Sequence, residues 1–171
     1  NTEDLECVVT VPDEAVGVEG SSIYLRKGER MRIIDLLYGL MLRSGNDSAE
    51  ALAILTSGSV GRFVLLMNKT ARRAGAADSH FANPHGLPCE DHYSTARDLA
   101  LISAYAMRDV TFRKIVSSKS YTFTEEGDTE RRTFVNKNKI LSMLEGGSGL
   151  KTGYTKEAGR CLVASAERDG R

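Results

Sequence analysis

Apolar and polar positions alternate every second residue near both ends of the chain and recur every three to four residues between them. Alternation is typical of strands with one buried face, and the longer spacing is typical of amphipathic helices. Near the N-terminus, residues 6–11 (ECVVTV) and 22–25 (SIYL) predict two short strands. The strands predicted in the second half are residues 119–124, 131–135, 149–153 and 160–166, with a polar turn at 125–130.

The middle of the chain predicts a group of helices. Residues 31–43 (MRIIDLLYGLMLR) are apolar on nearly every face, which predicts a central helix buried on all sides. Asn46 or Asp47 can serve as the N-cap of the next helix, and Ser94 as that of a later one. The other helical segments are predicted at residues 47–55, 60–74, 94–107 and 111–116. We therefore predict one α+β domain over residues 1–171, with strands in 6–25, a helical region in 31–117 and strands in 119–168.

Composition narrows the classes of function. The 171 residues include 23 Lys and Arg and 23 Asp and Glu, so the formal net charge is zero. A nucleic-acid-binding surface gathers basic side chains, so no nucleic-acid partner is expected. The longest apolar run, residues 33–42, is much shorter than the roughly 20 residues of a membrane-spanning helix.

Three cysteines, Cys7, Cys89 and Cys161, are far apart in the sequence and lack the paired spacing of metal ligands. We expect them to be buried as small apolar side chains rather than to form a zinc site or a disulfide framework. The first residue is Asn1 rather than Met, which indicates a cut or processed chain. The lack of a signal peptide therefore says little about the compartment.

Two short polar motifs carry candidate chemistry. Ser44-Gly45-Asn46 stands between a very apolar segment and a helix-forming one, where its side chains either turn a corner or face a substrate. Lys151-Thr152-Gly153 lies on a predicted strand, where the glycine lets a ligand approach the backbone beside a cation and a hydroxyl. The tripeptide Lys-Thr-Gly alone is common by chance.

Four longer segments extend these motifs: GSSIYLRKGERMRIIDLLYGLMLRSGNDSAEALA, HFANPHGL, HYSTARDLALI and GLKTGYTKEAGRCLVASAERDG. In order and spacing they resemble the serine-type D-alanyl-D-alanine carboxypeptidases, which are low-molecular-mass penicillin-binding proteins, and the resemblance covers essentially the whole chain. It implies a β-lactamase/transpeptidase-like α+β fold with no cofactor and no metal. It also implies an active site of three motifs, which are Ser-x-x-Lys with the acylated serine, Ser-x-Asn, and Lys-Thr-Gly.

The first of these motifs is missing from its expected place. In the family, Ser-x-x-Lys comes shortly before the segment that corresponds to residues 6–25 of this chain. The motif is therefore expected upstream of Asn1. The literal match Ser148-Gly149-Leu150-Lys151 lies in a strand-like, glycine-rich segment, where Lys at i+3 cannot reach Ser as it does on a helix. We therefore expect a catalytic-domain fragment truncated at both ends, whose partner is an upstream segment that carries Ser-x-x-Lys.

The resemblance implies three catalytic residues. The Ser44 hydroxyl relays a proton toward the leaving nitrogen, and Asn46 holds the substrate amide carbonyl and the lysine of Ser-x-x-Lys. Lys151 attracts the terminal carboxylate of the substrate.

The resemblance also implies three substrate-binding residues. Thr152 offers its hydroxyl to the same carboxylate, and the strand after Gly153 pairs with the extended peptide. The backbone N–H of Tyr154 completes the oxyanion hole. Some relatives carry His at this position, so the Tyr154 side chain receives no acid-base role.

His80, His85 and His92 lie within thirteen positions, close to acidic residues, which superficially suggests a metal site or a catalytic base. Their spacing fits no helix face, and Asn-Pro and His-Gly are turn chemistry. We expect a structural loop that flanks the cleft.

The function implied for the parent protein is removal of the terminal D-alanine from peptidoglycan stem peptides that end in D-Ala-D-Ala, through an acyl-enzyme. The complete enzyme is expected to be acylated by β-lactam antibiotics. It is expected outside the cytoplasm, at the cell surface or in the periplasm, and associated with the membrane. A non-catalytic peptidoglycan-binding or interaction module is the alternative. A class A β-lactamase fits less well, since such enzymes usually carry Ser-Asp-Asn and an additional loop Glu.

Overall fold

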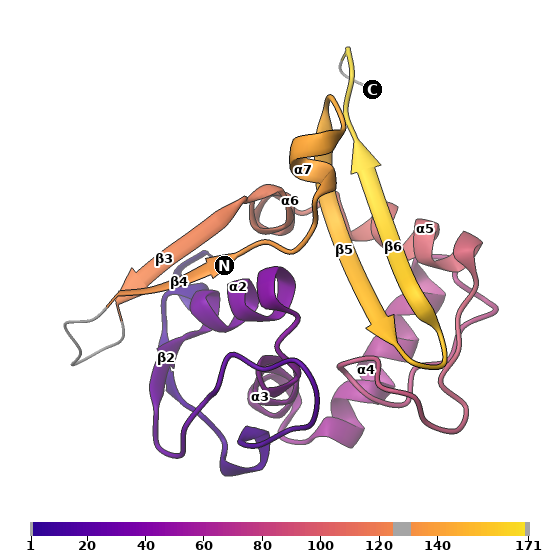
Figure 1. Ribbon diagram of the computed structural model, residues 1–171. Coiled ribbons are helices and arrows are strands. Elements are labelled where there is room, and N and C mark those ends of the chain that lie inside the picture. The colour runs from indigo at the N-terminus through magenta and orange to yellow at the C-terminus, as the bar shows by residue number, and fades with distance from the viewer. Residues whose placement is uncertain (1, 125–130, 170–171) are drawn as a thin grey trace.

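The computed structural model describes residues 2–124 and 131–169. Three two-stranded antiparallel sheets are combined with a group of helices (Figure 1). The first half consists of α1 (Thr2–Leu5), β1 (Val8–Thr10), the short 3-10 helix η1 (Asp13–Ala15), β2 (Arg30–Arg32), α2 (Ile33–Arg43), α3 (Asn46–Ser57) and α4 (Val60–Arg73). The second half consists of α5 (Ala96–Ala106), α6 (Val110–Ser117), β3 (Ser120–Thr124), β4 (Arg131–Val135), α7 (Ile140–Met143), β5 (Gly147–Thr155) and β6 (Gly159–Ala166).

Helix α2 lies at the centre of the molecule. It contacts α3, α6 and the β3–β4 hairpin, and none of its residues is fully exposed. Leu36 and Leu42 are almost completely buried, together with Met31 just before the helix. The predicted central position of this helix is therefore confirmed, but burial on all sides is not, because Leu40 and Met41 are only partly buried and line a cleft.

A ring stack and a hydrogen bond hold the β3–β4 hairpin against α2. The rings of Tyr38 and Tyr121 stack with centroids 3.6 Å apart, and the Tyr121 hydroxyl donates to Oδ1 of Asp35 at 2.6 Å. Arg32 donates to both oxygens of the same buried carboxylate. Burial and the hydrogen bond to Asp35 raise the pKa of Tyr121, so this hydroxyl stays protonated and remains a donor.

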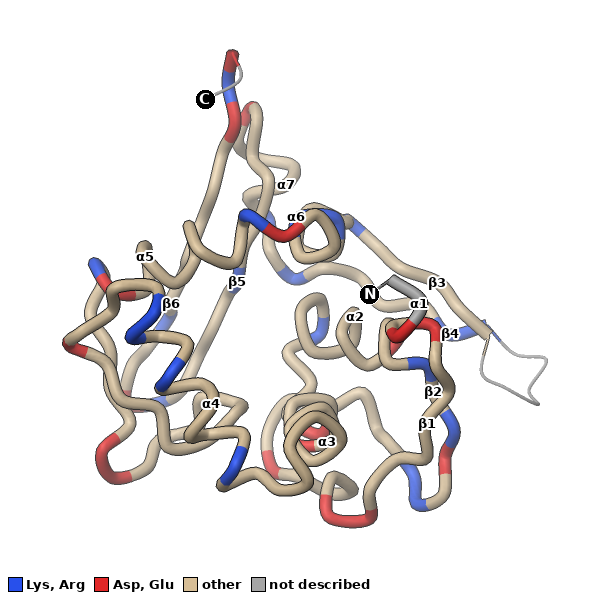
Figure 2. Tube along the Cα trace, turned by 180° about the vertical axis from the view of Figure 1, so that it is seen from behind, with Lys and Arg blue, Asp and Glu red and all other residues tan. Residues whose placement is uncertain are grey.

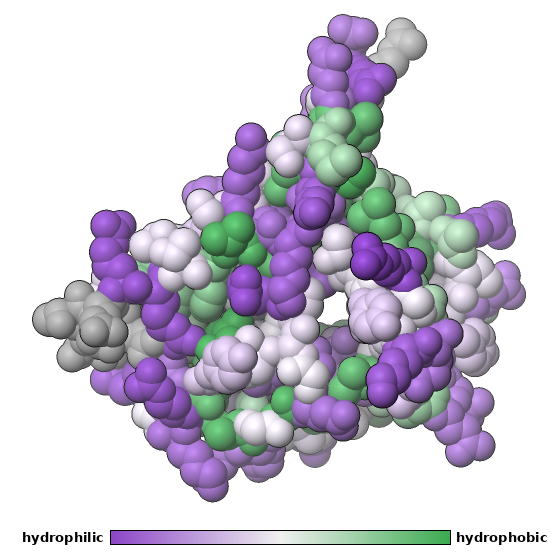
Figure 3. All heavy atoms as spheres, in the orientation of Figure 1, coloured by the Kyte–Doolittle hydropathy of each residue, from purple (hydrophilic) through white to green (hydrophobic). Residues whose placement is uncertain are grey.

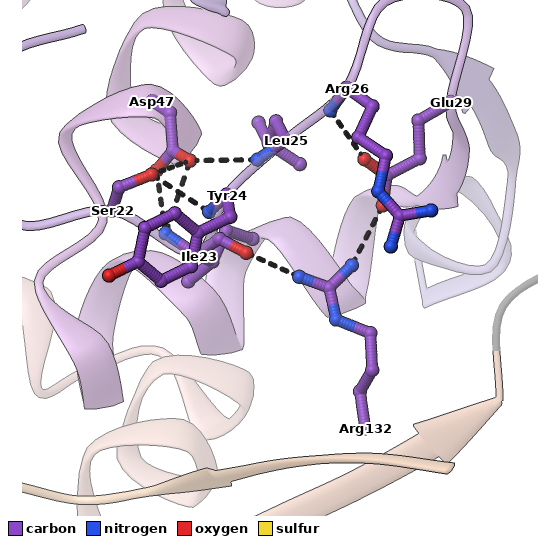
Figure 4. A network of polar contacts seen from close by, with 8 residues as sticks. All are labelled: Ser22, Ile23, Tyr24, Leu25, Arg26, Glu29, Asp47 and Arg132. Atoms are coloured by element: carbon purple, nitrogen blue, oxygen red, sulfur yellow. Dashed lines mark hydrogen bonds and ion pairs between the residues drawn. The ribbon is translucent and has the colours of Figure 1, made fainter. Parts of the chain in front are cut away.

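The predicted strand at residues 22–25 is wrong, because a carboxylate replaces a strand partner. Asp47 accepts the backbone N–H groups of Ile23 and Leu25 and the hydroxyl of Ser22 (Figure 4). On the other side, the Arg132 guanidinium donates to the Ile23 carbonyl oxygen. Since side chains satisfy the backbone groups that a sheet normally pairs, the segment is extended without being a strand.

The other elements follow the predictions with shifted ends. The predicted strand at 6–11 is β1, and its partner β2 uses the residues just before α2 that had been predicted as helical. Gly45 rather than Asn46 or Asp47 is the N-cap of α3, and Thr95 rather than Ser94 caps α5. The predicted turn at 125–130 lies outside the described residues, and helix α7 was not predicted.

The expected burial of the three cysteines is also wrong, because all three side chains are exposed. Basic and acidic residues are spread over several helices, strands and loops (Figure 2). Within the described part of the chain, no single helix has the length and apolar composition of a membrane span, although α3 and α4, bent by 87°, meet that test as a pair.

Candidate active site

Ser44 lies where α2 ends. Its backbone is in the left-handed region, with φ 59° and ψ 39°, and the N–H of the next residue, Gly45, donates to the Gly39 carbonyl oxygen at 3.2 Å. A residue with a side chain seldom adopts this conformation, which costs about 1–3 kcal/mol and persists where the surroundings enforce it. The turn ends α2 and places the Ser44 side chain in the wall of a cleft.

Asn46 is the first residue of α3 and is only 7% exposed. Its backbone N–H donates to the Ser21 carbonyl oxygen at 2.7 Å, and its Nδ2 donates to the Glu19 carbonyl oxygen at 2.6 Å. A Cβ atom at Gly20 would lie 2.6 Å from this Nδ2, so only glycine lets the chain pass so closely. Because an Asn amide has two N–H donors and one carbonyl oxygen, one N–H and the carbonyl oxygen remain for a ligand.

Lys151 reaches the site from β5. Its Nζ lies 2.5 Å from Oγ of Ser44 and 2.6 Å from the carbonyl oxygen of Thr152, and it donates to both. Burial lowers the pKa of Lys151 to about 8, with a smaller contribution from the positive charge of Lys137. Near neutral pH the side chain is therefore still mostly an ammonium that can attract an anion, but it gives up its proton more readily than an exposed lysine.

All the predicted site residues line one cleft of about 1240 Å³ between the helices and the β5–β6 hairpin. The space-filling view shows the molecule hollowed in this region (Figure 3). These residues are Ser44, Asn46, Lys151, Thr152, Gly153 and Tyr154. The structure thus brings together residues from α2, α3 and β5, while the Tyr154 side chain itself is 70% exposed.

Strand β5 forms one wall of the cleft and pairs with β6 along one edge. Among the described residues no other strand pairs with β5, so its second edge can accept an extended peptide. The literal Ser148-x-x-Lys151 match lies on this strand. Ser148 is hydrogen-bonded to Ser165, Oγ to Oγ at 2.8 Å, whereas Lys151 contacts Ser44, so this match does not form a Ser–Lys pair.

The histidine loop also borders the cleft. His85 and His92 line it, and Nε2 of His85 lies 3.3 Å from Oε1 of Glu50. Burial lowers the pKa of both histidines, which favours their neutral forms. Within residues 2–124 and 131–169, no group of three or more His, Cys, Asp or Glu side chains is arranged to hold a metal ion.

Sequence patterns missed two residues next to the site. Lys137 lines the cleft, its Nζ lies 3.5 Å from Oγ of Ser21, and burial lowers its pKa with a contribution from Arg43. It stands in the polar run NKNK, which gives no periodic signal. Asp47 was predicted only as a possible N-cap. Its carboxylate, directly after Ser-Gly-Asn, is also a candidate acceptor for backbone N–H groups of a neighbouring segment, and the structure shows it in that role.

The sequence matches the family described as D-alanyl-D-alanine carboxypeptidase, Peptidase S11, over residues 3–171. The chain belongs to this family. It is 36% identical over 160 residues to the D-alanyl-D-alanine carboxypeptidase DacF of Bacillus subtilis, and 38% identical over 182 residues to that of Streptomyces sp. strain K15. These alignments cover 94% and 98% of this chain but 41% and 62% of the relatives, so the chain spans about two to three fifths of their length.

Solved structures of such carboxypeptidases and transpeptidases share the fold. The Streptomyces K15 DD-transpeptidase matches with a TM-score of 0.88 at 37% identity, over 97% of this chain and 69% of that one. The D-alanyl-D-alanine carboxypeptidase DacD of Francisella tularensis matches with a TM-score of 0.87 at 27% identity, over 97% of this chain and 52% of that one. The predicted β-lactamase/transpeptidase-like α+β fold and the family resemblance are therefore confirmed.

Proposed function

We propose that the parent protein is a serine-type D-Ala-D-Ala carboxypeptidase that removes the terminal D-alanine from peptidoglycan stem peptides. The observation that carries the proposal is the hydrogen bond between Lys151 and Ser44 in a cleft beside the edge of β5, in a chain of this family. A cation, a hydroxyl and a strand edge are the groups needed to hold a short peptide that ends in a carboxylate.

The reaction proceeds through an acyl-enzyme. A serine hydroxyl gives its proton to the lysine of Ser-x-x-Lys and attacks the carbonyl carbon of the D-Ala-D-Ala bond. The tetrahedral intermediate then collapses to the acyl-enzyme, and the nitrogen of the leaving D-alanine takes up that proton through Ser44. Asn46 orients the peptide through its amide, while Lys151 and Thr152 hold the terminal carboxylate. The backbone N–H of Tyr154 stabilises the oxyanion, and water then releases the shortened peptide.

The nucleophile belongs to a segment with Ser-x-x-Lys that occupies the cleft together with the substrate. The apolar part of the cleft wall supports this proposal, because a helix buries one apolar face when it docks. This wall contains Leu40, Met41, Phe63, Leu66 and Met67. The proposed site of action is outside the cytoplasm, on a membrane-associated protein, and β-lactams acylate the complete enzyme.

A fluorescent penicillin tests this function. The intact protein is expected to retain the label after denaturation and to release D-alanine from a D-Ala-D-Ala peptide. The 171-residue chain by itself is expected to do neither, because its literal Ser-x-x-Lys match lies on β5. An intact protein that takes no label and releases no D-alanine contradicts the proposal and favours the non-catalytic binding module.

A further inference from the structure

We infer that Asp47 is a positioning residue for the proposed reaction, because it fixes the amide of Asn46 through the segment of residues 19–25. This inference rests on the proposed function. Asp47 directly follows the Ser-Gly-Asn motif, its side chain lies in the interior, and the residue is only 1% exposed.

The carboxylate of Asp47 gathers donors from that segment. Its Oδ2 accepts the Ser22 hydroxyl at 2.6 Å and the backbone N–H groups of Ile23 and Leu25 at 3.1 Å each (Figure 4). Its Oδ1 accepts the N–H of Ser48 at 2.9 Å, at the start of α3. The donors come from both α3 and the 19–25 segment, so the carboxylate ties the two together.

The same segment holds Asn46. Its Ser21 carbonyl accepts the backbone N–H of Asn46, and its Glu19 carbonyl accepts Nδ2. The hydrogen bond from Nδ2 fixes the orientation of the Asn46 amide. The Glu19 carbonyl oxygen can accept a hydrogen bond from the amide NH₂ group but not from the amide oxygen. If the segment shifts away from α3, the amide loses the contact that sets its orientation.

Glycines leave room for this arrangement. A Cβ atom at Gly45 would lie 2.8 Å from Oδ1 of Asp47, and one at Gly20 would lie 2.6 Å from Nδ2 of Asn46. Both close approaches occur where the segment, the carboxylate and the amide meet. The glycine inside the Ser-Gly-Asn motif therefore makes space for Asp47, which connects the motif to a residue outside it.

Asp47→Asn removes the positioning while almost preserving the shape of the side chain. One carboxylate oxygen becomes an NH₂ group, which in either orientation faces backbone N–H donors and cannot accept from them. In the intact protein we expect the second-order rate of acylation by penicillin to fall about tenfold or more, which corresponds to ~1.4 kcal/mol or more of lost transition-state stabilisation.

A double-mutant cycle separates positioning from a general loss of stability. If Asp47 acts through Asn46, Asp47→Asn lowers the acylation rate in the parent but has little further effect in an Asn46→Ala background. Ser22→Ala removes one donor and keeps the carboxylate, so it should show a smaller loss with the same dependence on Asn46. If Asp47→Asn does not fold, the double-mutant cycle of Ser22→Ala with Asn46→Ala provides the test.

Asp98→Asn is the matched control. Asp98 is also 1% exposed and accepts the Asp78 backbone N–H and the Ser79 hydroxyl, but it lies on α5 and does not line the cleft. This variant also changes a buried carboxylate to an amide, but it should leave acylation of the folded protein unchanged. Equal acylation in Asp47→Asn and the parent, or losses that multiply with those of Asn46→Ala, would overturn the inference.

A second measurement does not depend on catalysis. In ¹⁵N-labelled protein, the side-chain amide proton of Asn46 that is bonded to the Glu19 carbonyl should exchange slowly with solvent, because it is buried and hydrogen-bonded. Asp47→Asn should speed this exchange, and Asp98→Asn should not. Unchanged exchange in Asp47→Asn contradicts the inference. If the parent protein takes no penicillin, the proposed function fails while this measurement still decides what Asp47 does.

Discussion

Nζ of Lys151 lies 2.5 Å from Oγ of Ser44, although the two residues are 107 positions apart in the sequence. The contact joins the end of α2 to strand β5 across the cleft. It places a half-buried ammonium next to a hydroxyl on a residue with a left-handed backbone. Functional groups are often held in such uncommon conformations, which makes this pair the first target for mutation.

Lys151→Ala in the intact protein should weaken acylation by penicillin. The variant loses a charge-assisted contact to the substrate carboxylate, worth about 1.5–3 kcal/mol, so the acylation rate should fall tenfold or more at ~1.4 kcal/mol per decade. Stopped-flow measurement with a fluorescent penicillin gives this rate.

Lys151→Arg provides the comparison for that variant. Arginine keeps the charge but presents a planar fork in place of a compact ammonium, so it should not fully restore the rate. If Lys151→Ala is acylated as fast as the parent, Lys151 has a structural role and β5 is not the carboxylate-binding strand.

Acylation should also decline as the pH rises through about 8. The pKa of Lys151 is lowered to about 8, so the side chain is cationic below this pH and loses its proton above it. A substrate carboxylate is attracted only by the cationic form. A pH profile of the acylation rate, measured at constant ionic strength, should show this alkaline decline in the parent.

Removing the charge of Lys137 tests the origin of that decline. Lys137→Gln should raise the pKa of Lys151, because a neighbouring positive charge disfavours the ammonium, and the decline should move to higher pH. Lys139→Gln removes an equal charge two positions away, and Lys139 is not among the groups that lower this pKa. An equal shift in both variants would show that net charge, not proximity to Lys151, causes the effect.

The sequence predicted the helices and the four hairpin strands of the second half best, because their periodicity reflects burial. The structure also brings Ser44 and Lys151 into contact in the cleft where the motifs were expected to meet, and their catalytic roles stay predictions. Hydrophobic patterns could not show that Asp47 holds residues 22–25, since one buried carboxylate there replaces a whole strand partner. The same patterns gave no sign that Lys137 faces the cleft from a polar loop.

Tyr121→Phe should destabilise the protein while the ring stack with Tyr38 is kept. The variant removes the hydroxyl that lies 2.6 Å from Oδ1 of the buried Asp35, while Arg32 still donates to this oxygen. The loss of a hydrogen bond to a charged group should cost about 1.5–3 kcal/mol. Urea unfolding measures the change. Tyr24→Phe is the control, since Tyr24 is 81% exposed and its hydroxyl contributes little. A similar small change in both variants would show that the Tyr121 hydroxyl does not secure the β3–β4 hairpin.

Two glycine-to-alanine changes in helices should have opposite effects on the free energy of unfolding. At Gly39 in α2, a Cβ atom would lie 2.9 Å from Cδ1 of Ile23 and 2.9 Å from Oγ of Ser48, both on buried residues. Overpacking of this kind costs about 1–3 kcal/mol, and it presses on the segment that Asp47 holds.

Gly61→Ala in α4 is the counterpart, because a Cβ atom there meets nothing within 4 Å. Alanine restricts the unfolded chain more than glycine does, so this variant should be more stable by about 0.5–1 kcal/mol. Both changes replace glycine by alanine in an α-helix, so the gain in helix propensity is the same. The difference between their free energies of unfolding therefore reports the close packing of α2 against Ile23 and Ser48. If Gly39→Ala is as stable as Gly61→Ala, the space beside α2 is larger than these distances indicate, and the 19–25 segment is not held tightly against that helix.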